Sequence, residues 1–222
     1  MNDIENSFLM DRGDIALMKA ISRGDRESYL ILVKRYSDMI FRNAFRILCC
    51  REDADAVTLR TFKALKTDVL QYDDRFSLAE WLLRRMCIYS RMRIIRRRAL
   101  RIFGISTELY VGAAPVADHQ DDFLVKQAWE LYCRATKRMT PLQCIVFSLY
   151  ILEGLPQDRI SEMLGLPHLT IVMATRHAEE KVIEELRHYK RDEDYHNYIY
   201  FLKKVADSLT SDEIFAYICA HF

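Results

Sequence analysis

The sequence predicts an all-α protein. Two observations lead to this prediction: glycine and proline are scarce, at 6 and 4 of 222 residues, and apolar residues recur with a helical period along most of the chain. The length allows one large domain or two small ones, each able to bury a core. The formal net charge is +1, so affinity for a nucleic acid would have to come from where the charges lie.

Residues 14–101 predict four helices with short connections, as in an antiparallel bundle. Gly24 closes the first helix and Asp25 caps the second. The third helix spans about 53–69 and the fourth spans 77–102. The residues expected to face the core of the bundle include Met18, Tyr29, Leu32, Phe41, Val57, Phe62, Trp81 and Met86.

The fourth predicted helix carries the strongest charge feature of the chain. No Asp or Glu occurs between Trp81 and Thr107. The same span contains the arginines Arg84, Arg85, Arg91, Arg93, Arg96, Arg97, Arg98 and Arg101. Three of them are spaced four residues apart and share one helix face, which suits contacts with phosphates. The alternative is a solvated face balanced by acidic neighbours, which the lack of nearby carboxylates in the sequence disfavours.

Residues 104–122 lose the helical period and contain Gly, Pro and small residues, so they predict a linker. Its acidic residues Asp118, Asp121 and Asp122 either keep the linker solvated or supply negative charge to the start of the next helix. Residues 123–138 then predict a helix in which Trp129 anchors a core.

The stretch 139–187 predicts three helices separated by sharp turns. Thr140–Gln143 has the pattern of a capping box, and the helix that follows stops at Gly154. A short second helix ends at Gly165, and the third can start at Thr170. A short helix, a tight turn and a longer helix form a helix-turn-helix, in which the second helix of the pair normally enters the DNA major groove. The alternative is a helical hairpin unrelated to DNA.

The motifs in this stretch resemble those of the DNA-binding region of extracytoplasmic-function (ECF) sigma factors. The matching positions are Met139-Thr140-Pro141-Leu142-Gln143, Val146-Phe147, Glu153-Gly154-Leu155, Ile160, Glu162, Leu164-Gly165-Leu166, Thr170-Ile171 and Ala178. The pattern "A-I-x-x-G-D-x-x-x-Y-x-x-L-V-x-R-Y … A-x-R-I-L … D-A-D … T-F … W-L" resembles the N-terminal domain of the same family. The resemblance covers roughly residues 14–187.

The resemblance implies a different function for each segment of the chain. Residues 1–103 would form a four-helix sigma domain that binds the clamp of core RNA polymerase and melts the −10 promoter element through the arginines named above. Residues 104–122 would be a flexible linker. Residues 123–188 would form a helix-turn-helix domain without a wing, which binds the flap region of the polymerase and reads the −35 element. Residues 189–222 are an extension that the resemblance does not cover.

The third predicted helix departs from the family pattern D-A-E-D-L-x-Q-E-x-F. The polymerase-binding positions that the resemblance implies are Asp53, Asp55, Ala56, Leu59 and Arg60. The last three replace a carboxylate, a glutamine and a glutamate. An arginine in place of a glutamate would set like charge against a basic partner surface. The clamp interface is therefore expected to be lost or rebuilt.

The recognition helix departs from the family pattern T-V-K-S-R-L-x-R-A. The DNA-contacting residues that the resemblance implies are His168, Thr170, Val172, Met173, Thr175, Arg176 and His177. Val172 and Ala174 stand where basic residues are usual. Because Arg and Lys make the commonest specific contacts with base edges, weak reading of the −35 element is expected. A DNA-bound partner, such as an activator or an RNA-guided protein, would then supply the promoter location.

The extension 189–222 predicts two helices rich in aromatic residues, the second started by a capping box at Thr210–Glu213. The residues considered for a partner-binding face are Tyr195, Tyr198, Phe201, Phe215 and Tyr217. The other use of these aromatics is to pack back on the protein; interface anchors are the sharper hypothesis.

Several classes of protein are disfavoured. The six cysteines form no C-x-x-C and no metal spacing with histidine, which favours small buried residues in a reducing cytosol. Neither a signal peptide nor a membrane-spanning run is recognised, so we expect a cytoplasmic protein that does not associate with a membrane. No catalytic motif occurs, and neither an enzyme nor a cofactor is expected.

Two functional hypotheses remain. In the first, the chain is a bacterial alternative sigma factor whose partners are core RNA polymerase, promoter DNA and either an anti-sigma factor or a DNA-targeting recruiter. In the second, it is a degenerate sigma-like adaptor or regulator that binds proteins and no longer initiates transcription.

Overall fold

The computed structural model describes residues 12–68, 72, 75–103, 122–188, 195–207 and 211–221. All regular secondary structure in these residues is helical, so the prediction of an all-α protein is confirmed. The predicted linker, apart from Asp122, lies outside the described residues, and so do Thr210 of the predicted capping box and the chain up to residue 11.

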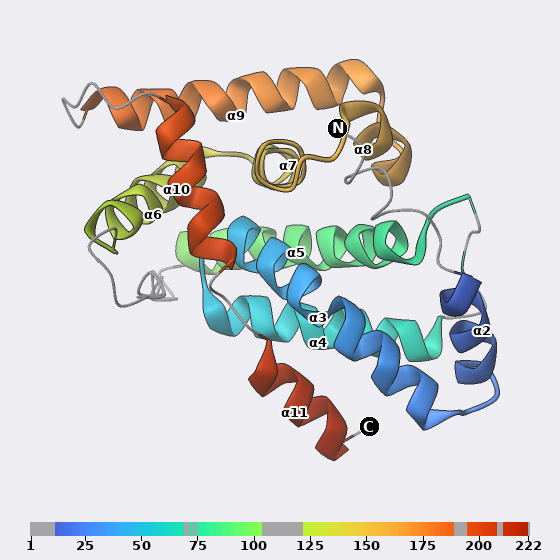
Figure 1. Ribbon diagram of the computed structural model, residues 1–222. Helices are drawn as coiled ribbons and strands as arrows, with labels where there is room; N and C mark the ends of the chain where they lie inside the picture. Colours follow the sequence, from blue (N-terminus) through green and yellow to red (C-terminus); the bar gives the residue numbers. More distant parts are fainter. Residues whose placement is uncertain are drawn as a thin grey trace.

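The N-terminal region contains α2 (Arg12–Ile21), α3 (Arg26–Leu48), α4 (Arg51–Thr67) and α5 (Leu78–Ile102). The predicted cap is present, because the Asp25 carboxylate accepts the N–H groups of Glu27 and Ser28. A capping box that was not predicted, formed by Ser77 and Glu80, starts α5. In Figure 1 α3 crosses in front of α4 and α5, and α2 stands at the far end of this group.

The C-terminal region contains α6 (Asp122–Arg138), α7 (Pro141–Val146), the π-helical segment η2 (Phe147–Leu152), α8 (Gln157–Leu164) and α9 (His168–His188). The α9 helix begins two residues before the predicted start. The helix begun by α7 widens into η2, where the Glu153 N–H reaches the Ser148 carbonyl at 2.9 Å, and Gly154 (φ +81) then ends it.

One hydrophobic core runs through both regions. The α5 helix packs on α7 and α8, and α3 packs on α7 and η2 (Figure 1). Across this junction Phe45 of α3 stacks on Trp129 of α6, with ring centroids 4.8 Å apart and planes 7° from parallel. Tyr132 and Phe147 continue the aromatic cluster at 5.5 Å steps. Trp129 is fully buried, which confirms its predicted role as a core anchor.

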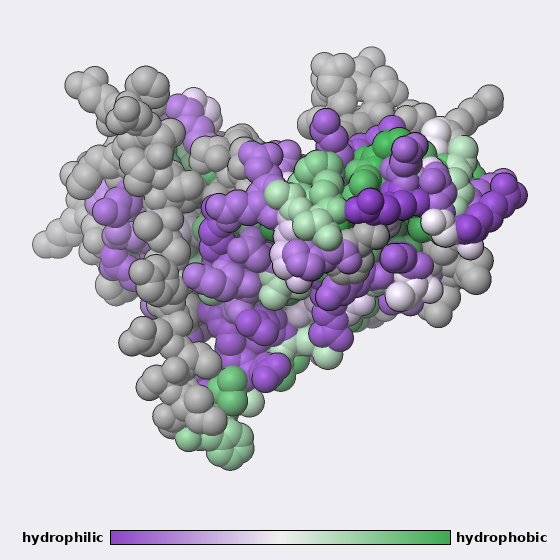
Figure 2. All heavy atoms as spheres, turned by 90° about the horizontal axis from the view of Figure 1, so that it is seen from below, coloured by the Kyte–Doolittle hydropathy of each residue, from purple (hydrophilic) through white to green (hydrophobic). Residues whose placement is uncertain are grey.

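The two helices of the extension, α10 (Tyr195–Asp207) and α11 (Asp212–His221), fold back on the protein. The α10 helix packs on α6, η2 and α3, while α11 packs on α3 and α4 (Figure 1). The Ser211 N–H and hydroxyl both donate to Asp38, at 2.9 and 2.7 Å. Figure 2 shows the face seen from below: hydrophilic side chains cover most of the described surface, and hydrophobic ones gather in a smaller patch.

Candidate nucleic-acid interface

The predicted helix-turn-helix corresponds to α8 and α9, which pack on the helix formed by α7 and η2. At the start of α7 the Gln143 N–H donates to the Thr140 hydroxyl at 3.2 Å and the Thr140 N–H donates to the Gln143 side chain at 2.8 Å, so the predicted capping box is confirmed. Gly165 (φ +65) ends α8 in a left-handed conformation. In the turn the Ser161 hydroxyl donates to the Leu166 carbonyl at 2.6 Å. A glycine and a side-chain hydrogen bond thus set the entry of α9.

The outer surface at the N-terminal end of α9 is largely apolar. Leu169 and Met173 are 70% and 41% exposed, and Val172 is half-buried. The polar residues exposed on this surface are His168, Thr170, Arg176 and His177. Six of the seven predicted DNA-contacting residues are therefore at least partly accessible.

Thr175 is the exception among the predicted contacts. It is 2% exposed, and its hydroxyl donates to the Ile171 carbonyl at 2.9 Å within α9. The expectation that Thr175 contacts DNA does not hold, because it lies one turn after Ile171 and just before Ala178, on the face that α9 turns toward the core.

Two arginines of α5 are paired inside the protein. Arg93 and Arg97 both hold the carboxylate of Asp53 in α4, which is 5% exposed, and the Arg97 Nη1–Asp53 Oδ2 distance is 2.6 Å. Arg97 also donates to the Leu48 carbonyl at 3.2 Å. One carboxylate distant in the sequence therefore pairs with both arginines and balances part of their charge, so the alternative of acidic neighbours applies in part to this pair.

Two further arginines also have internal partners. Arg85 lies 3.1 Å from Asp68 and Arg98 donates to the Met139 carbonyl. The remaining arginines are Arg91, Arg96 and Arg101, which are exposed, and Arg84, which is half-buried. The three exposed ones are the arginines best placed to contact phosphates.

A groove of about 460 Å³ runs between α5 and the α7–α8 region. Arg91 lies in its wall, together with the apolar residues Ile88, Ile95, Leu142, Ile145, Leu164 and Leu166. The exposed side of α5 thus adjoins the α7–α8 region, and α9 packs on that region in turn.

The predicted polymerase-binding residues of α4 fall into different environments. Asp53 is buried in its pairing with α5 and is an internal anchor, contrary to its expected role in a partner contact. Burial raises the pKa of Asp55 to about 6. The positive charge of Arg51 lowers this pKa, and the negative charges of Glu213 in α11 and of Glu52 raise it. The other three are Ala56 and Arg60, which are exposed, and Leu59, which is half-buried.

Arg60 has a partner of its own in α5. Its guanidinium group lies over the ring of Tyr89, 4.4 Å from the ring centroid. Arg60 is therefore accommodated within the protein by a cation–π contact.

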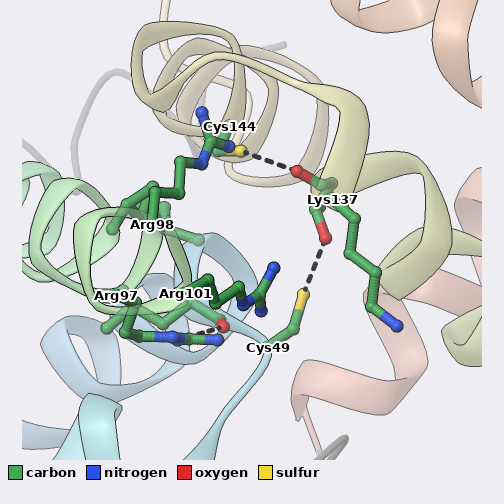
Figure 3. A pocket seen from close by; sticks show the side chains of 10 residues that line it. Cys49, Arg97, Arg98, Arg101, Lys137 and Cys144 are labelled. Carbon is green, nitrogen blue, oxygen red and sulfur yellow. Dashed lines mark hydrogen bonds between the residues drawn. The ribbon is translucent and has the colours of Figure 1, made fainter. Parts of the chain in front are cut away.

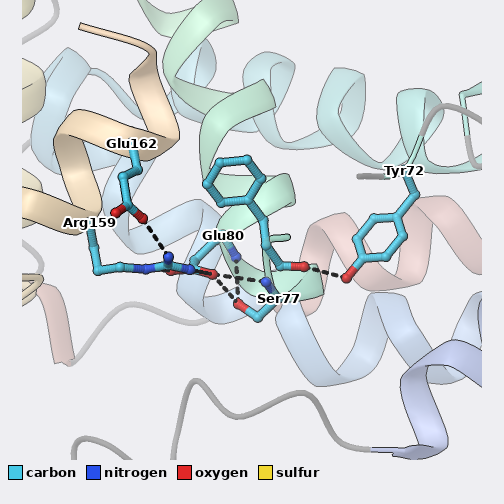
Figure 4. A network of polar contacts seen from close by, with 6 residues as sticks. Tyr72, Ser77, Glu80, Arg159 and Glu162 are labelled. Atoms are coloured by element: carbon cyan, nitrogen blue, oxygen red, sulfur yellow. Dashed lines mark hydrogen bonds and ion pairs between the residues drawn. The ribbon is translucent and has the colours of Figure 1, made fainter. Parts of the chain in front are cut away.

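A polar network ties α8 to the start of α5 (Figure 4). Arg159 makes two bonds of 2.7 Å to the carboxylate of Glu80 and a third of 2.7 Å to Glu162. The Ser77 N–H donates to the same Glu80 carboxylate at 2.8 Å. Burial alone would raise the pKa of Glu80, but Arg159 and Ser77 together hold that pKa below its usual value. The helix-turn-helix is thereby fixed to the N-terminal region.

A second ion pair crosses the same junction. Arg46 of α3 and Glu153, which follows η2, are 2.7 Å apart, and their side chains are only 3% and 13% exposed. Beside this pair the Ser148 hydroxyl donates to Asn43 at 3.3 Å. The two regions are therefore joined by buried polar contacts as well as by the aromatic cluster.

The aromatic residues of the extension are divided between core and surface. Tyr198 is 2% exposed, so it packs back on the protein and is not available to a partner. Tyr195 is half-buried and donates to Glu179 at 3.3 Å. Phe201 and Phe215 are also half-buried, whereas Tyr217 is 44% exposed. Of the predicted partner face, Tyr217 is the most accessible member.

Comparison with known proteins identifies no family for this chain. No protein-family model matches the sequence, and no curated protein matches it. Within the described residues no three His, Cys, Asp or Glu side chains are grouped so as to hold a metal ion. None of the described helices has the length and apolar character needed to cross a membrane.

Proposed function

We propose that this chain is an alternative sigma factor of the ECF type, which binds core RNA polymerase and directs it to promoters. The observation that carries the proposal is that a helix-turn-helix with an accessible α9 surface packs through α8 on the arginine-rich α5, which has three exposed arginines. Arginine side chains on a helix supply affinity for phosphates, and a helix presented after a tight turn fits the major groove.

The proposal assigns a role to each part of the chain. Residues 1–103 form the sigma domain that binds the polymerase clamp and the −10 element, and residues 104–122 form the linker. Residues 123–188 form the helix-turn-helix domain, and residues 189–222 form the extension. Cytoplasmic location follows from this role.

The surface of α9 supports weak reading of the −35 element. Leu169, Val172 and Met173 offer no hydrogen-bonding side chain to base edges, although they suit a thymine methyl group. Arg176 forms only an exposed ion pair with Glu180, so it can exchange that carboxylate for a phosphate at little cost. A DNA-bound partner, docked on the C-terminal region or near Tyr217, would then place the complex on its promoter.

The test is retention of core RNA polymerase by the purified chain, followed by open-complex formation on promoters with and without a −35 element. We expect open-complex formation to be equally efficient on promoters with and without the −35 element. Arg96→Ala removes an exposed arginine of α5 and should weaken opening while polymerase binding persists; Arg85→Ala, whose arginine already pairs with Asp68, is the matched control. A −35-dependent footprint by the isolated chain would contradict placement by a partner.

The second candidate is an adaptor that binds proteins without initiating transcription. It is favoured by the internal use of Asp53 and Arg60, which removes two groups from the predicted polymerase contact. No retention of core polymerase, together with a folded chain by circular dichroism, would select this function.

A further inference from the structure

Three cysteines from three elements meet where the two regions join. Cys49 follows α3, Cys133 lies in α6 and Cys144 lies in α7, and each is 1% or 2% exposed. The Cys49 sulfur lies 3.4 Å from the Thr136 hydroxyl, and the Cys144 thiol donates to the Thr136 carbonyl at 3.8 Å. The Cys133 thiol lies within hydrogen-bonding reach of Cys49.

A cavity of about 50 Å³ adjoins two of these thiols, those of Cys49 and Cys144 (Figure 3). Cys49 and Cys144 lie in its buried wall, and its lining also includes the cations Arg97, Arg98, Arg101 and Lys137. Arg101 and Lys137 are exposed, so the cavity leads inward from solvent to the sulfur atoms. Since a site of roughly 10–15 Å³ can hold one water, this cavity can admit a polar molecule of a few atoms.

Cys49 differs from the neighbouring cysteines in its backbone conformation and in the pKa of its thiol. It adopts a left-handed conformation (φ 49, ψ 33), which is strained for a residue with a side chain and is the only such non-glycine case in the described residues. Burial alone would raise the pKa of its thiol, but hydrogen bonds from Cys133 and Thr136 and the charges of Arg97 and Lys137 bring that pKa below its usual value. Burial instead raises the pKa of Cys144 to about 12.

We propose that Cys49 is a peroxide-reactive thiol that forms a reversible disulfide with Cys133. In the first step the Cys49 thiolate attacks one oxygen of a small hydroperoxide; an S–O bond forms, the O–O bond breaks, and hydroxide or alkoxide leaves. In the second step the Cys133 sulfur attacks the sulfenic sulfur of Cys49, the S–S bond forms, and the hydroxyl group leaves with the Cys133 proton as water. The sulfur atoms lose two electrons and the hydroperoxide gains them.

The surroundings fit this chemistry and a small oxidant. Arg98 and Arg101 extend toward the same space as the two labelled cysteines, where positive charge stabilises the departing oxygen anion (Figure 3). Two fully buried tyrosines nearby, Tyr132 and Tyr198, have hydroxyl groups with no hydrogen-bond partner in the described chain. The size of the cavity favours hydrogen peroxide and disfavours a bulky disulfide such as oxidised glutathione.

The bond would join the end of α3 to α6 and so tie the N-terminal region covalently to the C-terminal region. A disulfide of this kind in a reducing compartment is a transient, redox-sensing one. The inference holds whether or not the chain binds RNA polymerase, since it rests on the cysteine cluster and the cavity alone.

The test treats the reduced full-length chain with hydrogen peroxide and maps its thiols by mass spectrometry without reduction. A Cys49–Cys133 linked peptide is expected, with a midpoint of thermal unfolding that rises on oxidation and returns with dithiothreitol. In Cys133→Ser, Cys49 should accumulate as a sulfenic acid that dimedone traps. Because the wild-type map needs no variant, the test survives if a substitution prevents folding.

Cys87→Ser is the matched control, because Cys87 is equally buried in α5 and burial raises its pKa to about 12. This variant should react as the wild type does, and in the wild type Cys49 should oxidise on the order of tenfold faster than Cys87. An unmodified Cys49 beside an oxidised Cys219 would overturn the proposal. So would a bond from Cys49 to Cys50 or Cys144 in place of Cys133.

Discussion

The junction between the two regions and the outer surface of α9 each contain an Arg–Glu ion pair, buried at the junction and exposed on α9. At the junction, the side chains of Arg46 and Glu153 are 3% and 13% exposed. On α9, those of Arg176 and Glu180 are 72% and 55% exposed. Removing one partner of a buried pair leaves an uncompensated charge, whereas an exposed pair is replaced readily by water or by a phosphate. Burial therefore decides which arginines hold the fold and which remain available to a ligand.

The largest effect is expected at the buried pair of the junction. Arg46→Ala leaves the Glu153 carboxylate without its cation and should lower the free energy of unfolding by about 3–5 kcal/mol. Urea denaturation followed by circular dichroism measures this change. The double variant Arg46→Met, Glu153→Leu should recover much of the loss, because it removes both charges. A loss below about 1 kcal/mol would mean that the pair does not hold the junction.

An intermediate effect is expected where one carboxylate holds two arginines. Asp53→Asn keeps the shape but removes the charge that pairs with Arg93 and Arg97, so stability should fall by about 1–3 kcal/mol. Both arginines then become available to phosphates. Affinity for duplex DNA should therefore rise, and the slope of log K against log salt should steepen by about one to two. An unchanged slope in fluorescence anisotropy titrations would show that these arginines face away from DNA.

A smaller effect concerns the pH dependence of stability. Burial raises the pKa of Asp55 from 3.8 to about 6, so between these values the folded state binds more protons than the unfolded state. Stability should consequently fall as pH rises through this window. Because Asp55 is half-buried, solvent screening limits the loss to about 1 kcal/mol. Asp55→Asn should flatten this part of the curve of unfolding free energy against pH; an identical curve for the variant would exclude Asp55 as its source.

The smallest effect is expected on the outer surface of α9. Arg176→Ala breaks only the exposed pair with Glu180 and should change stability by less than about 0.5 kcal/mol. If Arg176 contacts a phosphate, the salt dependence of DNA binding should weaken by about one unit of slope, equally for all sequences. A loss of sequence preference in competition experiments would instead assign Arg176 to a base contact.

Much of the fold could be predicted because it depends on local signals. The cap at Asp25, the Thr140–Gln143 capping box, the stop at Gly165 and the core position of Trp129 all follow from residues within one or two helical turns. The accessible part of the candidate interface was predicted in a different way. The resemblance named seven α9 positions as DNA contacts, and six of them are at least partly accessible.

Most of the exceptions involve contacts between segments far apart in the chain. Thr175 is a local exception, because the resemblance named it as a DNA contact although its spacing from Ile171 and Ala178 places it on the buried face of α9. The pairing of Arg93 and Arg97 with Asp53 was missed because no carboxylate lies near these arginines in the sequence. Tyr198 was considered for a partner-binding face but is buried, because aromatic residues at helical spacing occur both in cores and at interfaces.

The sequence by itself determined that the protein is all-α and, to within about two residues, where α4 and α9 start, because capping and amphipathic periodicity act over a few residues. Only the tertiary structure decided which charges are neutralised, which aromatics are buried and which thiols meet. Cys49, Cys133 and Cys144 show no motif in the sequence, and they come together only because α3, α6 and α7 pack at one junction. Burial and electrostatic pairing depend on spatial neighbours, and the order of residues along the chain does not specify them directly.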